Sequence, residues 1–353
     1  MSRIAPVASP TISAVVPARR AGRRFGPGAV LAGSVALLGV VVLACLAIGT
    51  RHVPFDVVLQ AFTSPVADDP DQVVVRDLRL PRAVIAVMAG AAFGVVAALL
   101  QGATRNPLAD PGLLGINAGA SLAVVAAITF TGAASPFGFI WFAFAGAALA
   151  AAVVFAVGSA GGGATPARLA LTGAAVTAAA TPLITLLLIS DEGTLSQYRF
   201  WSVGSLAGRG LETATVLWPF LVVGLALAGW LATRLNLLAL GDDLARGLGV
   251  RLGVTRVVTA AAVIVLAGTA TSLAGPIALL GLTVAHAARG LVGGDHRWLM
   301  PVGAVLGAIV LLASDVIGRV VVAPAELEAG IVAAIIGAPV LIALVRRTRG
   351  SAL

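Results

Sequence analysis

Three arginines are the residues of this sequence best suited to recognising a charged partner. Arg79 and Arg82 frame a short Arg-Leu-Pro-Arg corner, and Arg319 follows Asp315 by one helical turn. Because the planar guanidinium pairs with carboxylates bidentately, these positions are suited to binding acidic groups. The alternative is that they are helix-end arginines at the level of the lipid headgroups. In either case Asp315 is placed to neutralise or orient Arg319.

A second candidate is the polar segment 240–250, which reads LGDDLARGLGV. Asp242 or Asp243 can cap a short helix, and Gly247 or Gly249 can end it. Taken alone, this pattern favours an ordinary capped turn between two apolar segments.

Several other kinds of chemistry are missing from the sequence. All 23 basic residues are arginine, so a phosphate-binding loop of the GxxxxGK[ST] type is impossible and this chain cannot supply that ATP site. No apolar segment offers an acid–base pair, a catalytic dyad or a metal-ligand spacing, so we expect neither an enzyme nor a metal site. Cys45 is the single cysteine, which excludes a disulfide framework. His286 is best explained as a packed or interhelical hydrogen-bonding residue.

The composition places these residues in a membrane protein. Hydrophobic residues make up 59% of the chain, charged residues only 11%, and the mean hydropathy is +1.05. A soluble domain cannot bury that much apolar surface. The 42 glycines indicate helices that pack closely through small residues. The predicted fold class is therefore an all-α polytopic membrane protein.

Apolar segments of bilayer-spanning length predict ten spans within one transmembrane domain, 28–346. They lie near 28–50, 82–103, 111–131, 138–160, 167–190, 211–233, 255–274, 276–293, 299–320 and 328–346. Residues 1–27 form an arginine-rich tail that we expect to be disordered, and residues 347–353 form a second tail. The longest links are external segments at 51–81 and 191–210, the second with a short amphipathic piece, and a cytoplasmic loop at about 234–254.

The distribution of arginines supports an even number of spans with both ends of the chain in the cytoplasm. In that topology most of the 23 arginines lie in cytoplasmic segments, as the positive-inside rule requires. The external segments and the outer ends of the spans carry the others, which are Arg51, Arg76, Arg79, Arg82, Arg199, Arg209 and Arg319.

An ordered series of residues then points to a family. The series comprises Arg79-Leu80-Pro81-Arg82, Gln101, the run Asn106-Pro107-Leu108-Ala109-Asp110-Pro111-Gly112-Leu113-Leu114-Gly115, and Gly119-Ala120. With it the chain resembles the iron-siderophore and vitamin B12 permeases of bacterial ABC importers, and the resemblance covers nearly everything after about Gly28. It is most similar to permeases for ferric siderophores of the enterobactin type. The resemblance implies about ten helices in two halves, spans two to five and seven to ten, related by a pseudo-two-fold axis.

The same resemblance assigns roles to particular residues. It makes the 240–250 segment a coupling helix that inserts into a cleft of the ATPase subunit, with contacts from Gly241, Asp242, Ala245, Leu248 and Gly249. It makes Arg79, Arg82 and Arg319 the sites that meet glutamates of a substrate-binding protein. Candidates for the pathway or its gate are Gln101, Asn106, Asn117 and Thr165. The family usually has proline where Ala285 stands, so the helix there is expected to be straighter.

These implications define an expected function, which is transport without chemistry. We expect a permease subunit in the bacterial inner membrane that moves a ferric siderophore, with the catecholate type favoured. Its expected partners are a second permease chain (a heterodimer rather than a homodimer), two ATP-binding cassette subunits that bind ATP and magnesium, and a periplasmic or lipid-anchored binding protein. No cofactor in this chain and no nucleic acid are expected.

Several alternatives stay open. Within the family the cargo could be vitamin B12, haem or a hydroxamate siderophore. Outside it, the chain could be an ion-coupled carrier or a membrane scaffold without transport activity. The near absence of carboxylates in the middle of the spans disfavours the carrier.

Overall fold

The computed structural model describes residues 26–112, 114–132, 136–160 and 166–350, and all regular secondary structure within them is helical. The helices are α1 (Pro27–Ala47), α2 (Phe55–Thr63), α3 (Pro70–Val73), the π-helical turn η1 (Val74–Arg79), α4 (Leu80–Thr104), α5 (Ile116–Thr131), α6 (Pro136–Ser159), α7 (Pro166–Ser190), α8 (Glu192–Ser202), α9 (Leu211–Leu238), α10 (Asp242–Gly247), α11 (Leu252–Ala274), α12 (Leu280–Val292), α13 (His296–Val321) and α14 (Ala329–Gly350).

The all-α membrane fold predicted from composition is confirmed. By length and composition, seven helices within the described residues are able to cross a membrane: α1, the continuous helix that ends in α4, α6, α7, α9, α11 and α13. Shorter apolar helices, α5, α12 and the first part of α14, lie at the other three predicted spans. The predicted amphipathic piece in the 191–210 segment is α8.

Two of the predicted spans begin later than expected. The helices start at Ile116 and Leu280 rather than at 111 and 276. Each is preceded by a proline-containing stretch and then by a residue with positive φ, +71° at Gly115 and +65° at Leu279. A left-handed residue cannot continue an α-helix, so the chain enters both helices from an irregular segment.

The segment 51–81, which we predicted as an external loop, is largely helical. The ten residues of α3 and η1 continue directly into α4, so that one helix runs from Pro70 to Thr104. This helix starts at a strong cap. The Asp69 carboxylate accepts hydrogen bonds from the backbone N–H groups of Asp71 and Gln72, and Pro70 occupies the first helical position.

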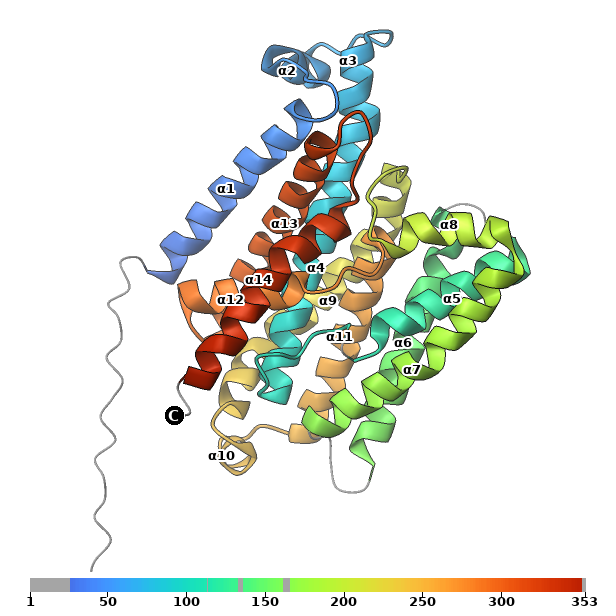
Figure 1. Ribbon diagram of the computed structural model, residues 1–353. Helices are drawn as coiled ribbons and strands as arrows, with labels where there is room; N and C mark the ends of the chain where they lie inside the picture. The colour runs from blue at the N-terminus through green and yellow to red at the C-terminus, as the bar shows by residue number, and fades with distance from the viewer. Residues whose placement is uncertain (1–25, 113, 133–135, 161–165, 351–353) are drawn as a thin grey trace, which may run out of the picture.

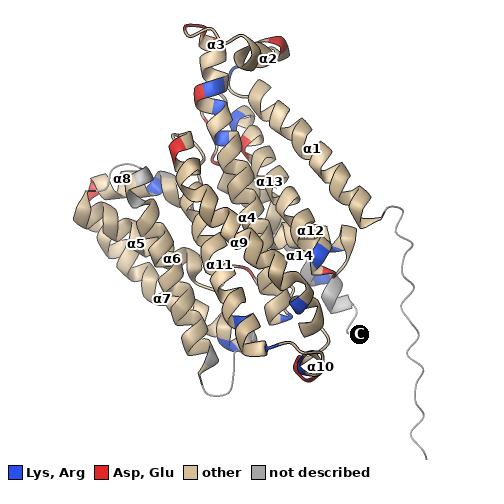
Figure 2. Cartoon of the chain, turned by 180° about the vertical axis from the view of Figure 1, so that it is seen from behind, with Lys and Arg blue, Asp and Glu red and all other residues tan. Residues whose placement is uncertain are grey.

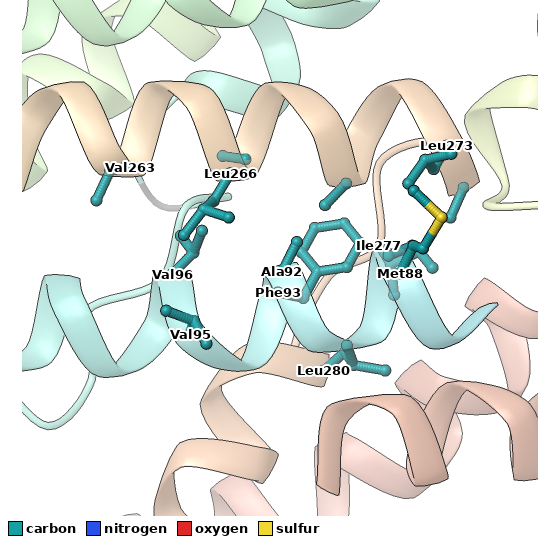
Figure 3. Packing of buried hydrophobic residues seen from close by; sticks show 14 of the residues in the cluster. Met88, Ala92, Phe93, Val95, Val96, Val263, Leu266, Leu273, Ile277 and Leu280 are labelled. Carbon is teal, nitrogen blue, oxygen red and sulfur yellow. The ribbon is translucent and has the colours of Figure 1, made fainter. Parts of the chain in front are cut away.

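Helix α4 lies at the centre of the bundle (Figure 1). Its most extensive contact in the described part of the chain is with α13, followed by α11. Figure 3 shows Met88, Phe93 and Val96 of α4 directed toward Leu266 and Leu273 of α11. By contrast, α1 and α7 lie at the periphery with mostly exposed side chains, as expected of helices that face lipid or another subunit.

Four glycines bring the backbones of α4 and α13 into direct contact. A methyl group added to Gly94 would lie 2.1 Å from the carbonyl oxygen of Gly303, and one added to Gly307 would lie 2.0 Å from that of Gly90. Each helix therefore carries a Gly-x-x-x-Gly pair, and the two pairs meet in antiparallel register. Small residues allow this approach, in which van der Waals packing rather than water exclusion holds membrane helices together.

We predict that Gly94→Ala destabilises the protein by about 1–3 kcal/mol, because the added methyl group forces the two backbones apart. The measurement is the apparent thermal unfolding midpoint of the purified protein in detergent. Gly39→Ala is the matched control, since nothing lies within 4 Å of its added methyl group on α1. Equal midpoints for the two variants would show that the close contact is dispensable.

Candidate coupling and docking sites

Among the described residues, charged residues gather at the two ends of the bundle and few lie in its middle (Figure 2). We refer to these as the α10 end and the α2 end, after the short helices that lie there. The predicted coupling residues lie at the α10 end, and the three predicted docking arginines lie at the α2 end.

The short helix expected in the 240–250 segment is present as α10, and glycines form both of its boundaries. Gly241 precedes it with φ of +109°, and Gly249 follows it with φ of +84°. These are conformations that side chains rarely adopt, so glycine is needed at both places. Ala245 is fully buried against Leu238 and its neighbours, and this contact seats the helix on the bundle.

The carboxylate of Asp242 does not cap α10 as we expected. It forms ion pairs with Arg105 and, at 2.7 Å, with Arg256. Arg105 ends α4 and also donates from Nε to the carbonyl oxygen of Leu238 at 2.9 Å, while Arg256 lies on α11. One carboxylate therefore ties α10 to α4 and α11, and Arg105 ties the same point to α9.

The neighbouring arginines keep the Asp242 carboxylate charged. Partial burial acts to raise the pKa of Asp242, but the hydrogen bond from Arg105 and the charges of Arg105 and Arg256 outweigh it and hold the pKa below its usual range. The carboxylate is consequently ionised at neutral pH, and the link has the strength of charge-assisted hydrogen bonds.

An apolar row projects from the same end. Leu240, Leu244 and Leu248 recur every four residues, and their exposed fractions are 57%, 62% and 58%. Exposed leucines beside charged groups, outside the apolar spans, are typical of a surface that another protein covers. The sequence interpretation had included Leu248 but not the other two leucines, whose regular spacing was the available signal.

Two of the three predicted docking arginines are buried at the α2 end. Arg79 is 4% exposed and Arg319 is 2% exposed. Arg79 donates to the carbonyl oxygens of Leu46, at 2.7 Å, and Arg51. Arg319 donates to the carbonyl oxygen of Cys45 at 3.2 Å. Both side chains therefore lie beneath the surface and hold the carboxyl-terminal end of α1, whose helix dipole favours cations. Their docking role stays a prediction.

Arg82 is the partly accessible member of the three. Its guanidinium forms ion pairs with Asp315 at 2.9 Å and with Glu326 at 2.8 Å, and its side chain is 14% exposed. Asp315 also forms an ion pair with Arg319 at 3.0 Å, so the predicted partnership between those two residues is present. The cluster joins the start of α4, the end of α13 and the segment before α14.

The structure does not bring the four pathway candidates together. Gln101 is buried and accepts a hydrogen bond from Arg289 at 3.2 Å. Asn106 accepts from the backbone N–H of Leu108 at 2.9 Å and so shapes the turn after α4. Asn117 is half-buried near the start of α5 and its Oδ1 has no hydrogen-bond partner among the described residues. Thr165 lies outside the described residues.

Two polar clusters, one around buried Asp110 and one around half-buried Asn236, were missed by the sequence interpretation. Asp110 accepts from the backbone N–H groups of Gly112 and Leu282, which joins the turn before α5 to the first turn of α12. Asn236 of α9 donates to Asp295 at 2.6 Å and accepts from the backbone N–H of His296 at 2.9 Å. Asp295 begins α13 as its cap. Both clusters position helices, and no group of metal-binding side chains occurs among the described residues.

Comparison with known proteins identifies the family. The model of the FecCD transport family matches residues 37–347, which is most of the chain. The chain belongs to the FecCD transport family. It is 46% identical over 323 residues to the ferric enterobactin transport system permease protein FepD of Escherichia coli (strain K12), covering 91% of this chain and 96% of that protein.

Two further comparisons agree with this assignment. The chain is 41% identical over 291 residues to the siderophore transport permease protein YfiZ of Bacillus subtilis (strain 168), covering 82% of this chain and 87% of that protein. A solved structure of a metal-chelate type ABC transporter in an inward-facing conformation superposes with a TM-score of 0.78 at 28% identity, covering 91% of this chain. The FecCD chain is thus a multi-pass membrane permease subunit of an iron-chelate ABC importer, a transport component rather than an enzyme.

We predict that Arg79→Gln loosens the end of α1. The shorter amide cannot donate to both the Leu46 and Arg51 carbonyls, so the free energy of local opening at the end of α1 should fall by about 1–3 kcal/mol. Hydrogen exchange of the backbone amides in 45–53 should become about tenfold faster or more. Arg82→Gln is the control, because Arg82 bonds no residue of α1. Equal protection of 45–53 in both variants would contradict this fastening role.

Proposed function

We propose that this permease moves a ferric siderophore, with the catecholate type favoured, across the bacterial inner membrane. Its α10 end faces the cytoplasm in this proposal. The observation that carries the coupling role is the α10 site, a short helix with an outward row of leucines, tied by Asp242 to α4 and α11 and by Arg105 to α9. The family assignment supplies the context, since an importer permease works with a partner ATPase and a substrate-binding protein.

The orientation follows from the arginines. Among the described residues, the arginines at the ends of the spans and in the links between them are more numerous at the α10 end than at the α2 end, and the positive-inside rule places the richer end in the cytoplasm. Both ends of the chain are then cytoplasmic. The acidic segment 51–81 faces the other side, where the binding protein delivers its cargo.

In this proposal α10 transmits the movement of the ATPase to the spans. Leu240, Leu244 and Leu248 enter a groove of the partner, and Gly241 and Gly249 allow the sharp turns on either side. A displacement of α10 acts directly on α4 and α11, because the Asp242 ion pairs connect α10 to both helices. ATP and magnesium are bound by the partner and not by this chain.

Docking of the binding protein falls mainly to Arg82. Arg79 and Arg319 are held by α1 carbonyls, so they support the surface from beneath, while Arg82 can exchange Glu326 for a partner's carboxylate. Charge reversal at Arg82 is the variant expected to weaken docking, most visibly at low salt. Unchanged docking affinity would remove Arg82 from this role.

We predict that Leu248→Asp uncouples ATP hydrolysis from uptake. A desolvated carboxylate in the partner's groove would be unfavourable, so transport should fall about tenfold or more while ATP hydrolysis by the partner continues. The measurements are ATPase activity and siderophore uptake of the same assembled transporter. Val66→Asp is the control, an equally exposed apolar residue at the α2 end. Unchanged uptake in Leu248→Asp would remove the coupling assignment.

The cargo is proposed from the relatives. The most similar ones named above are a ferric enterobactin permease and a siderophore permease. Other relatives are named as permeases for iron(3+)-hydroxamate, Fe(3+)-citrate and hemin, so each of these is an alternative cargo within the family. Because the enterobactin type uses two different permease chains, we favour a heterodimer over a homodimer.

The test is uptake of radiolabelled iron by cells that lack this gene, supplied in turn with ferric catecholate, ferric hydroxamate, ferric citrate and haem. We expect loss of catecholate uptake alone, restored by the intact gene. Loss of another chelate would overturn the cargo and leave the permease role standing. Co-purification with an ATPase separates the importer from an ion-coupled carrier, which would transport without one.

A further inference from the structure

A basic cavity opens beside the coupling helix, between α9 and α11. Its volume is about 640 Å³, and its walls include Trp230, Arg234, Leu237, Leu248, Arg251 and Val254. It thus lies at the α10 end and shares Leu248 with the coupling segment. No role proposed above uses its two arginines.

These two arginines have no acidic partner among the described residues, unlike most arginines of the α10 end that lie near them. Arg105, Arg246, Arg256 and Arg297 each form an ion pair with an aspartate. Arg234 instead donates to the carbonyl oxygen of Trp230 at 2.7 Å, and the Arg251 side chain forms no hydrogen bond or ion pair with the described residues.

The third feature is the start of α11. Its cap residue is Arg251, its first turn holds no acidic side chain, and no side chain bonds its free N–H groups. Together with the two arginines, this end of a 23-residue helix adds a positive field to the same wall of the cavity. This wall of the cavity is therefore suited to an anion.

The apolar walls and Trp230 indicate where that anion comes from. The guanidinium of Arg234 lies 3.4 Å from the centre of the Trp230 ring, and Trp230 is 42% exposed on the outer face of α9. Tryptophan beside arginine at the end of a span is typical of the headgroup level of a bilayer. Val254 and Leu237 continue the wall as apolar surface suited to an acyl chain.

We propose that this cavity binds the phosphate headgroup of an anionic phospholipid, with Arg234 and Arg251 on the phosphate and Trp230 beside the glycerol region. Basic pockets between spans on the cytoplasmic side suit such headgroups. The lipid braces the segment that includes Leu248 and Gly249 against α9 and α11. The site concerns this chain and the bilayer, and it stands whatever the cargo is.

The test uses tryptophan fluorescence of the full-length protein in vesicles of phosphatidylcholine. Phosphatidylglycerol with brominated acyl chains quenches a nearby indole, and we expect more quenching than with brominated phosphatidylcholine, an excess that Trp230→Phe removes. In Arg234→Gln with Arg251→Gln, the apparent affinity for phosphatidylglycerol should fall about thirtyfold, from two lost charge contacts.

Arg168→Gln with Arg346→Gln is the matched control, because it removes the same charge from the α10 end outside the cavity. An equal loss of affinity in this control, or none in the cavity variant, would overturn the proposal. Relief of quenching by millimolar inorganic phosphate would assign the cavity to a soluble anion instead. Loss of the partner ATPase from the cavity variant, with quenching unchanged, would assign the arginines to a protein contact.

Discussion

The direct contact of α4 with α13 is the constraint on which the rest of the bundle depends. In a bilayer the lipid tails are as apolar as leucine, so helices gain little by burying leucines and much by approaching closely. Gly90 and Gly94 meet Gly307 and Gly303 across this contact. The same solution recurs where Gly119 meets the backbone of Gly146, which explains why a chain with few aromatic residues is so rich in glycine.

Helix α4, held by this contact, also connects the two ends of the molecule. Helix α4 begins beside Arg82 and ends at Arg105, so it takes part in both candidate sites. Arg82 and Arg105 are 23 positions apart in the sequence, which corresponds to roughly 35 Å at 1.5 Å per residue. A rigid helix pinned to α13 along its length carries a displacement at one end to the other. Another arginine, Arg209, holds α11 by donating to the main-chain carbonyl of Ser272 at 2.7 Å.

The sequence was informative about features set by local composition. The ten spans and the short helix at 242–247 follow from hydropathy and from glycines that end helices. Features set by distant partners were missed. From the sequence Arg79 resembles a surface residue, but in the fold the end of α1 covers it. Likewise Asp242 resembles a helix cap, but in the fold it pairs with Arg105 and Arg256 of other helices. The late starts of α5 and α12 depend on left-handed residues, and a leucine at one of them gives no sequence signal.

The burial of Cys45 has a practical consequence. The thiol is wholly enclosed, and its sulfur accepts a hydrogen bond from Arg319 at 3.0 Å. As the single cysteine in the sequence, it leaves the native surface without a reactive thiol. Cysteines introduced at exposed positions such as Leu244 and Val66 would then accept spin labels selectively. The distance between the two labels would report how far the α10 end and the α2 end move relative to each other, in a protein that needs no removal of native cysteines.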